Sequence, residues 1–154
     1  MPAVPAIYVD ADACPVKDEV MRVAVRHKLI VLFVANQGAR PSRDPMIRYV
    51  TVPPGPDAAD DWIVANLLAN DIVVTADILL AERALAAGAH VVGPNGRPHT
   101  QSSIGMAVAM RNLKQQLRES GADRGLNPEF SERDRSAFLQ VLHETAERAL
   151  RQQK

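Results

Sequence analysis

The sequence predicts a single α/β domain with a parallel sheet, helices on both faces in three layers, and two helices at the C-terminal end. The chain has 154 residues, close to the commonest size of one domain. Short apolar runs alternate with helix-like segments over the first hundred residues, as in a parallel sheet covered by helices. Aromatic residues make up only 4% of the chain, so Val, Ile, Leu and Ala must build the core. We expect one domain over residues 1–154, with an α/β core over about 5–100 and a helical part over about 101–152.

The α/β core contains five predicted strands with helices between them. The apolar runs that predict the strands cover residues 7–10, 29–35, 46–52, 71–75 and 90–93. Pro15 fixes a φ angle suited to the first position of a helix, which we expect to run to about Lys28. Helical spacing predicts two further helices over 57–70 and 78–87, and Asn70 is expected as a left-handed cap.

The tail differs from the core because the alternation ends after Asn95-Gly96. Two segments with helical spacing follow, over 103–118 and 131–151. Ser131 and Asp134 have the spacing of a capping box at the start of the second. We expect both helices to pack onto the sheet.

Charge and cysteine content limit the partners and the compartment. The 18 basic and 18 acidic side chains cancel, so the chain lacks the overall positive field with which many proteins hold duplex nucleic acid. Any phosphate partner must be held locally. The only cysteine, Cys14, cannot form an internal disulfide, which fits a reducing compartment. The start lacks a secretory pattern and no apolar run reaches membrane-spanning length, so we expect a cytoplasmic protein with no membrane partner.

Acidic residues follow three of the predicted strands. Asp10 and Asp12 come where the first strand passes to its helix, Asp60 and Asp61 lie in the first turn of the 57–70 helix, and Asp77 follows the 71–75 strand. If these strands are parallel, all five acids face one crevice at the carboxyl edge, where open α/β sheets bind ligands. Two carboxylates 4 Å apart repel by about 4 kcal/mol at an effective dielectric constant of ~20, so a cation or a proton must offset their charge.

A hard divalent cation, Mg²⁺ or Mn²⁺, is the ion that such an all-carboxylate site predicts, with Asp10, Asp60, Asp61 and Asp77 as ligands. Zn²⁺ would recruit His or Cys, and these residues show no ligand spacing here. Helix capping is the competing explanation for the acids of the 57–70 helix and for Asp77. It does not cover Asp10, which ends a buried strand, where an unpaired charge is costly.

A metal held in this way predicts hydrolysis of a nucleic-acid backbone, because it polarises a phosphodiester and lowers the pKa of a bound water. We expect Asp10, Asp12 and Asp77 to act in catalysis. Asp12 or Asp77 could serve as the general base, and the sequence does not separate base from ligand.

Five further residues are candidates for substrate contact, each with a simpler role as the alternative. Lys17 lies one turn into the first helix and Asn36 ends the second strand, where an Asx turn would also explain it. Arg40 and Arg43 lie in a loop and could grip phosphates, although solvation explains each alone. Thr75 ends the 71–75 strand and could bind a phosphate.

Four motifs in the first hundred residues carry a resemblance to a known family. They are Val9–Lys17 (VDADACPVK), Phe33–Asn36 (FVAN), Asp57–Asp61 (DAADD) and Asp71–Ala81 (DIVVTADILLA). With these motifs the chain resembles the YaiI/YqxD family of bacterial proteins, which is grouped with the PIN-domain-like superfamily.

The resemblance implies a PIN-like three-layer domain whose acids bind Mg²⁺ or Mn²⁺ for cleavage of nucleic acid, with RNA favoured over DNA as the partner. Asp10 matches the first-strand acid, Asp60 or Asp61 the middle acid, and Asp77 the acid of the T-x-D motif. The sequence departs from the family at Leu79, where Pro is common, and at the predicted cap of the 57–70 helix, where Gly is common. The oligomeric state stays open, with a homodimer as one option.

Two other functions remain open at this point. A HAD-like phosphatase would use Asp10 as nucleophile and Asp12 as general acid, with Thr75 binding phosphate. That mechanism needs a downstream lysine and a further acidic pair, yet no lysine lies between Asp77 and Lys114. A non-catalytic, metal-stabilised module that binds RNA or a protein is the third reading.

Overall fold

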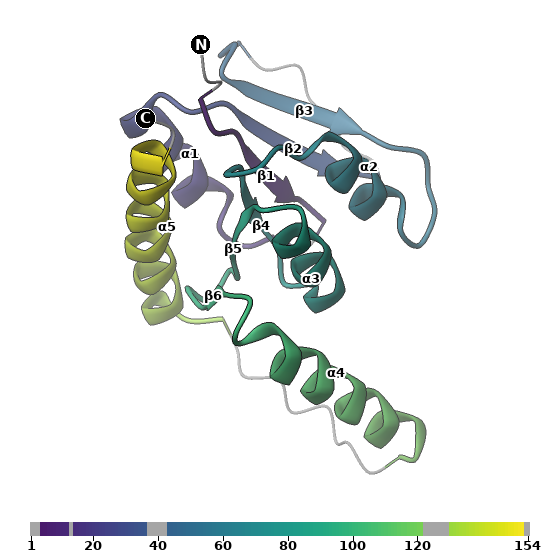
Figure 1. Cartoon of the computed structure of the whole chain (residues 1–154). Coiled ribbons are helices and arrows are strands. Elements are labelled where there is room, and N and C mark those ends of the chain that lie inside the picture. The colour runs from purple at the N-terminus through teal and green to yellow at the C-terminus, as the bar shows by residue number, and fades with distance from the viewer. Residues whose placement is uncertain (1–3, 13, 37–42, 122–129, 153–154) are drawn as a thin grey trace.

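The computed structural model describes residues 4–12, 14–36, 43–121 and 130–152, and these form a six-stranded sheet flanked by helices (Figure 1). The strand order is β3-β2-β1-β4-β5-β6. The strands are β1 (Ile7–Asp10), β2 (Val31–Ala35), β3 (Ile47–Thr51), β4 (Ile72–Val74), β5 (His90–Val92) and β6 (Pro98–His99). The first five strands are parallel, and β6 pairs antiparallel with β5. The predicted parallel α/β sheet is therefore confirmed.

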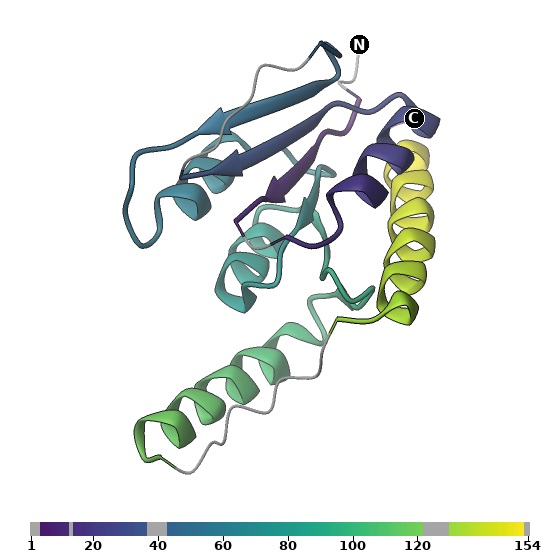
Figure 2. The same ribbon diagram turned by 180° about the vertical axis from the view of Figure 1, so that it is seen from behind.

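Helices cover both faces of this sheet. The helices are α1 (Lys17–His27), α2 (Ala58–Asn66), α3 (Ile78–Ala86), α4 (Ile104–Glu119) and α5 (Glu132–Gln152), and α1, α2, α3 and α5 cover the sheet. Because side chains alternate along a strand, Ile7 and Val9 of β1 pack into the core under α1 and α5, whereas Tyr8 packs into the core under α2 and α3. Figures 1 and 2 show the two helical layers on opposite sides of the sheet. The three-layer arrangement predicted from the sequence is confirmed.

Strand β6 was not predicted, because the alternation was read as ending at Asn95-Gly96. The chain turns there, where the Gly93 amide donates to the Arg97 carbonyl and the Gly96 amide donates to the Gly93 carbonyl, and it returns as a short edge strand. Gly96 has a φ of +85°, and a Cβ on it would lie 2.7 Å from the carbonyl carbon of Ala137 in α5. Only glycine combines this backbone conformation with so close an approach.

Helix α5 packs on the sheet as predicted, and its first turn has the predicted capping box. The Ser131 amide donates to Asp134 Oδ2 at 3.0 Å, and the Asp134 amide donates to Ser131 Oγ at 3.2 Å. Asn70 has the predicted left-handed conformation, with φ of 78°, although α2 itself already ends at Asn66.

Helix α4 does not pack on the sheet, and here the prediction was wrong. Its first turns contact α3, and Ile104 is its only buried residue. The rest of the helix projects from the body of the domain (Figures 1 and 2). An apolar stripe on the helix faces solvent, formed by Met106, Met110, Leu113 and Leu117. Across the described part of the chain, no helix has the length and apolar character needed to span a membrane.

Candidate functional site at the carboxyl edge of the sheet

The sheet has a topological switch point between β1 and β4. The chain leaves β1 toward α1 on one face and leaves β4 toward α3 on the other, so a crevice opens between these two strand ends. Val9 is in register with Val74, which sets Asp10 opposite Thr75 at the carboxyl edge. The edge that the sequence marked as acidic is thus the edge at which an open α/β sheet binds ligands.

Thr75 joins the acids of the two strand ends. Its buried hydroxyl donates a hydrogen bond to Asp10 Oδ2 at 3.1 Å and accepts one from the backbone amide of Asp77 at 2.9 Å. Asp77 in turn caps α3, because its Oδ1 accepts from the amides of Leu79 and Leu80 at 2.9 and 3.3 Å. The predicted capping role of Asp77 is therefore real, and both cap bonds use one oxygen, which leaves Oδ2 outside the cap. Thr75 positions the two acids.

Asp60, in the first turn of α2, completes the arrangement. Its pKa is raised to about 7, first by burial, then by the negative charges of Asp77 and Asp10, by a hydrogen bond with Asp77 and by the charge of Asp57. The pKa of Asp10 is also raised, chiefly by burial, with Asp77 and Asp12 adding to the shift and the Thr75 hydrogen bond opposing it. These mutual effects show that Asp10, Asp60 and Asp77 lie close together. We call these three residues the acidic cluster.

The other two predicted acids lie at the border of the acidic cluster. Asp12 is exposed near Asp10, and its Oδ2 accepts from the Asn36 amide at 3.4 Å. Asp61 is 65% exposed and forms an ion pair of 2.9 Å with Arg83 of α3. The sequence left the choice between Asp60 and Asp61 open, and the structure brings Asp60 next to Asp77 and Asp10 while Asp61 pairs with Arg83.

The donor chemistry of the acidic cluster fits a hard divalent cation, because every donor is a carboxylate oxygen. At the same edge the side-chain oxygen of Asn36 is buried without a hydrogen-bond partner. Among residues 4–12, 14–36, 43–121 and 130–152, however, no three His, Cys, Asp or Glu side chains are arranged to hold one ion. Carboxylates without a cation repel each other, so a looser arrangement with a proton near Asp60 is expected. Ion binding would have to draw them closer.

Of the remaining predicted residues, Lys17 is the exposed first residue of α1. Arg40 lies outside the described residues. Arg43 precedes β3 and so lies at the amino end of the strands, away from the acidic cluster. Burial raises the pKa of the Cys14 thiol, and the side chain packs against the core under α1 and α5.

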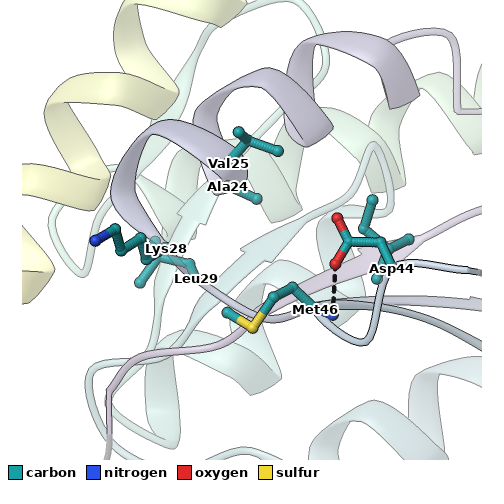
Figure 3. Close-up of a pocket in the computed structure, with 7 residues that line it drawn as sticks. Ala24, Val25, Lys28, Leu29, Asp44 and Met46 are labelled. Carbon is teal, nitrogen blue, oxygen red and sulfur yellow. Dashed lines mark hydrogen bonds between the residues drawn. The ribbon is translucent and has the colours of Figure 1, made fainter.

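A small pocket also lies at that amino end of the sheet (Figure 3). It has a volume of about 310 Å³ between the end of α1 and the start of β3, and Ala24, Leu29 and Met46 make much of its lining apolar. Asp44 points across it and accepts a hydrogen bond from the Met46 amide at 2.9 Å. The pocket is at the far end of the strands from the acidic cluster and offers no part of its chemistry.

A larger cavity, of about 880 Å³, lies beside the acidic cluster between the sheet edge and α4. Thr75 and Ala76 line its inner end, and Arg97, Arg111 and Lys114 are among its other lining residues. We call it the basic cleft. These cations were not predicted from the sequence, although Arg111, Lys114 and Arg118 are spaced by three and four residues, which places them on one helix face.

Comparison with known proteins identifies relatives of the chain but assigns no chemistry to these residues. A family model described as "Uncharacterized BCR, YaiI/YqxD family" matches residues 8–148. A UPF0178 protein of Mesorhizobium japonicum is 63% identical over 98% of this chain and 97% of its own length. UPF0178 proteins of Agrobacterium fabrum and Parvibaculum lavamentivorans are 61% and 56% identical, each over 92% of this chain and 93% of the relative. No solved structure matches the chain. From the family model and the full-length relatives it follows that the chain belongs to the YaiI/YqxD family.

Proposed function

We propose that this protein is a metal-dependent hydrolase that cleaves phosphodiester bonds of nucleic acid at the acidic cluster. The observation that carries the proposal is the convergence of Asp10, Asp60 and Asp77 at the switch point, where burial and their mutual repulsion raise the pKa of Asp60 to about 7. A bound divalent cation would remove that repulsion. Structural carboxylates of a stable domain rarely gather without such a partner.

In this proposal Asp10, Asp60 and Asp77 would hold Mg²⁺ or Mn²⁺. The ion would polarise the phosphodiester and lower the pKa of an attacking water. The chain's own residues fix the acids: the Thr75 hydroxyl orients Asp10, and the first amides of α3 hold Asp77. Asp12 is exposed beside Asp10 and lies outside the acidic cluster, so we assign it the general base that takes the proton of the attacking water.

RNA is the substrate that we propose first, with DNA second. The chain carries 18 basic and 18 acidic side chains, so it has no excess of cations with which to hold a duplex by bulk charge. A substrate must be held by local contacts. Single-stranded RNA meets this condition because its flexible backbone can reach a recessed site.

The test is a Mn²⁺ titration with single- and double-stranded RNA, the corresponding DNA and a generic phosphate monoester. We expect Mn²⁺-dependent backbone cleavage that falls at least about 100-fold in Asp10→Asn, equivalent to ~2.7 kcal/mol of transition-state stabilisation. Asp61→Asn is the matched control, because Asp61 neighbours Asp60 in sequence yet pairs with Arg83. It should retain activity within about twofold, as surface substitutions do.

Each of the other outcomes would support a different function for this protein. Turnover of the monoester through a phosphorylated Asp10 would establish the phosphatase mechanism instead. Metal-dependent RNA binding without any cleavage would leave a non-catalytic module. An equal loss of activity in the Asp61→Asn and Asp10→Asn variants would contradict the proposal that the acidic cluster is the catalytic site.

A further inference from the structure

We propose that the basic cleft binds the phosphodiester backbone of single-stranded RNA, with Arg97, Arg111 and Lys114 contacting phosphates next to the acidic cluster. This inference rests on the proposed function for its connection to catalysis. It specifies where the RNA strand lies on the protein and which side chains hold it.

The position of the cleft is the first support. Thr75 lines the cleft and is the residue whose hydroxyl bonds Asp10, and Ala76, next to Asp77, lines it as well, so the cleft borders the acidic cluster. One wall consists of the loops after β4 and β5, and the other is α4. Figures 1 and 2 show α4 projecting beyond the sheet, which extends this wall away from the body of the domain. An RNA strand that lies along this wall would present its phosphodiester backbone to the acidic cluster at the inner end of the cleft.

The sign of the charge is the second support. Among the described residues that line the cleft none is Asp or Glu, whereas Arg97, Arg111, Lys114 and Arg118 line it. The chain as a whole is neutral, yet its acidic cluster lies at the strand ends and Arg111, Lys114 and Arg118 lie on α4 beside it. A cleft lined by one sign of charge attracts ligands of the other sign. This arrangement supplies the local hold on a polyanion that the balanced composition requires.

Three cations of the cleft, Arg97, Arg111 and Lys114, are also available for a ligand. In the described part of the chain, no carboxylate forms an ion pair with Arg97, Arg111 or Lys114. Among the described residues, Arg111 donates to the neutral side chains of Asn112 and Gln115, at 3.3 and 3.2 Å. These partners carry no charge, and a phosphate could replace them with bidentate hydrogen bonds.

The apolar lining favours a single strand over a duplex or a free phosphate. Ile78, Met110 and Phe130 line the same cleft as the cations. Unstacked bases of a single strand need apolar or aromatic surface to pack against, whereas a duplex keeps its bases stacked inside. Inorganic phosphate would use the cations alone. The combination of cations and apolar side chains matches the two chemical parts of a single-stranded nucleic acid.

The experiment measures binding without catalysis. Full-length Asp10→Asn protein in EDTA is titrated onto a labelled single-stranded oligoribonucleotide of about 12 nucleotides, a length that can span such a site, with fluorescence anisotropy as the readout. The test variant adds Arg111→Ala and Lys114→Ala. The control adds Arg22→Ala and Arg26→Ala instead, which remove two exposed cations from α1, away from the cleft. Circular dichroism checks that both variants fold.

We expect the test variant to bind at least about tenfold more weakly than its parent, and the slope of log K against log salt to become shallower by about 1.4, which corresponds to two lost phosphate contacts. The control variant should bind within about twofold of the parent, because surface charges far from a site contribute little. Equal binding of single-stranded DNA would support the same backbone contacts. Preference for duplex RNA, or an equal loss in both variants, would overturn the inference.

This design separates the inference from the proposed function. Binding in EDTA by an Asp10→Asn protein requires neither a metal nor cleavage. If RNA binds specifically through the basic cleft but the unmodified chain does not cleave it, only the proposed enzymatic activity is rejected. If cleavage persists unchanged when Arg111 and Lys114 are replaced, only the proposed role of the basic cleft is rejected.

Discussion

Helices α4 and α5 follow one another in the tail and are held in opposite ways. Helix α5 has 21 residues and buries five of them, Phe138, Leu142, Thr145, Ala146 and Ala149. Helix α4 has 16 residues and buries only Ile104. Most helical stability in proteins comes from packing of an apolar face. The free energy of folding is therefore concentrated in α5 and the sheet, while α4 is left with side chains free to meet a ligand.

The exposed side of α4 makes the contrast sharper. Met106, Met110, Leu113 and Leu117 repeat at spacings of four, three and four residues, a pattern as regular as that of a packed helix. They are 72, 51, 50 and 40% exposed. An apolar period thus predicts a helix, but it does not tell which surface the helix will meet. Arg111, Lys114 and Arg118 of the basic cleft lie on a neighbouring face of the same helix.

The largest effect that we predict is in α5. Phe138→Ala should lower the free energy of unfolding by about 3–5 kcal/mol, because the fully buried ring leaves a cavity in the core under α1 and α5. Denaturant unfolding followed by circular dichroism measures it. A loss below about 1 kcal/mol, the size of an ordinary surface effect, would show that α5 is not docked and would erase the contrast with α4.

Two glycines offer a matched pair for the same comparison. Gly96→Ala should cost about 2–4 kcal/mol, because it places a Cβ at a φ of +85° and within 2.7 Å of the α5 backbone. Gly105→Ala on α4 should leave stability unchanged or raise it by up to about 1 kcal/mol, because the new Cβ meets nothing within 4 Å and alanine favours a helix. Thermal unfolding of both variants checks the sign. Destabilisation by the second substitution would mean that α4 is packed in solution.

The sequence predicted the helices, the strands and the acidic edge of the sheet better than it predicted which side chains and helices contact one another. Buried strands such as β1 have continuous apolar runs, so their positions along the chain and the acidic edge of the sheet could be predicted from the sequence. Strand β6 was missed because it has two residues, too few for any period. Asp60 and Asp61 look alike in sequence, and only the rotation of α2 turns one toward Asp77 and the other toward Arg83. The basic cleft could not be predicted, because it depends on how α4 lies relative to the sheet.

The pH dependence of the free energy of unfolding tests whether the acidic cluster is buried in the packed part of the domain. The pKa of Asp60 is raised from 3.8 to about 7, so between these values the folded chain holds a proton that the unfolded chain has lost. In EDTA this contribution to stability is complete below about pH 4 and disappears as pH rises through about 7. His27, His90 and His99 have lowered pKa values and act in the opposite direction.

The Asp60→Asn variant isolates the carboxyl from those histidines. The difference in free energy of unfolding between the parent and the variant should fall as pH rises from about 4 to 7, since only the parent carries the titrating group. Asp61→Asn, whose carboxylate is exposed beside Arg83, is the control and should leave the pH profile unchanged. A flat difference for Asp60→Asn would show that Asp60 is solvated like an ordinary surface acid and is not in contact with Asp10 and Asp77.

The smallest effect should come from the apolar stripe of α4. Leu113 is 50% exposed, so Leu113→Gln removes little buried surface and replaces one good helix former with another. We expect the free energy of unfolding to change by less than about 0.5 kcal/mol, against about 2–5 kcal/mol for Leu142→Ala in α5. Both are measured by denaturant unfolding at several protein concentrations. If Leu113→Gln instead costs more than about 1 kcal/mol, the stripe is covered in solution, and dependence of that loss on protein concentration would identify a second copy of the chain as the cover, because association stabilises the folded state by mass action.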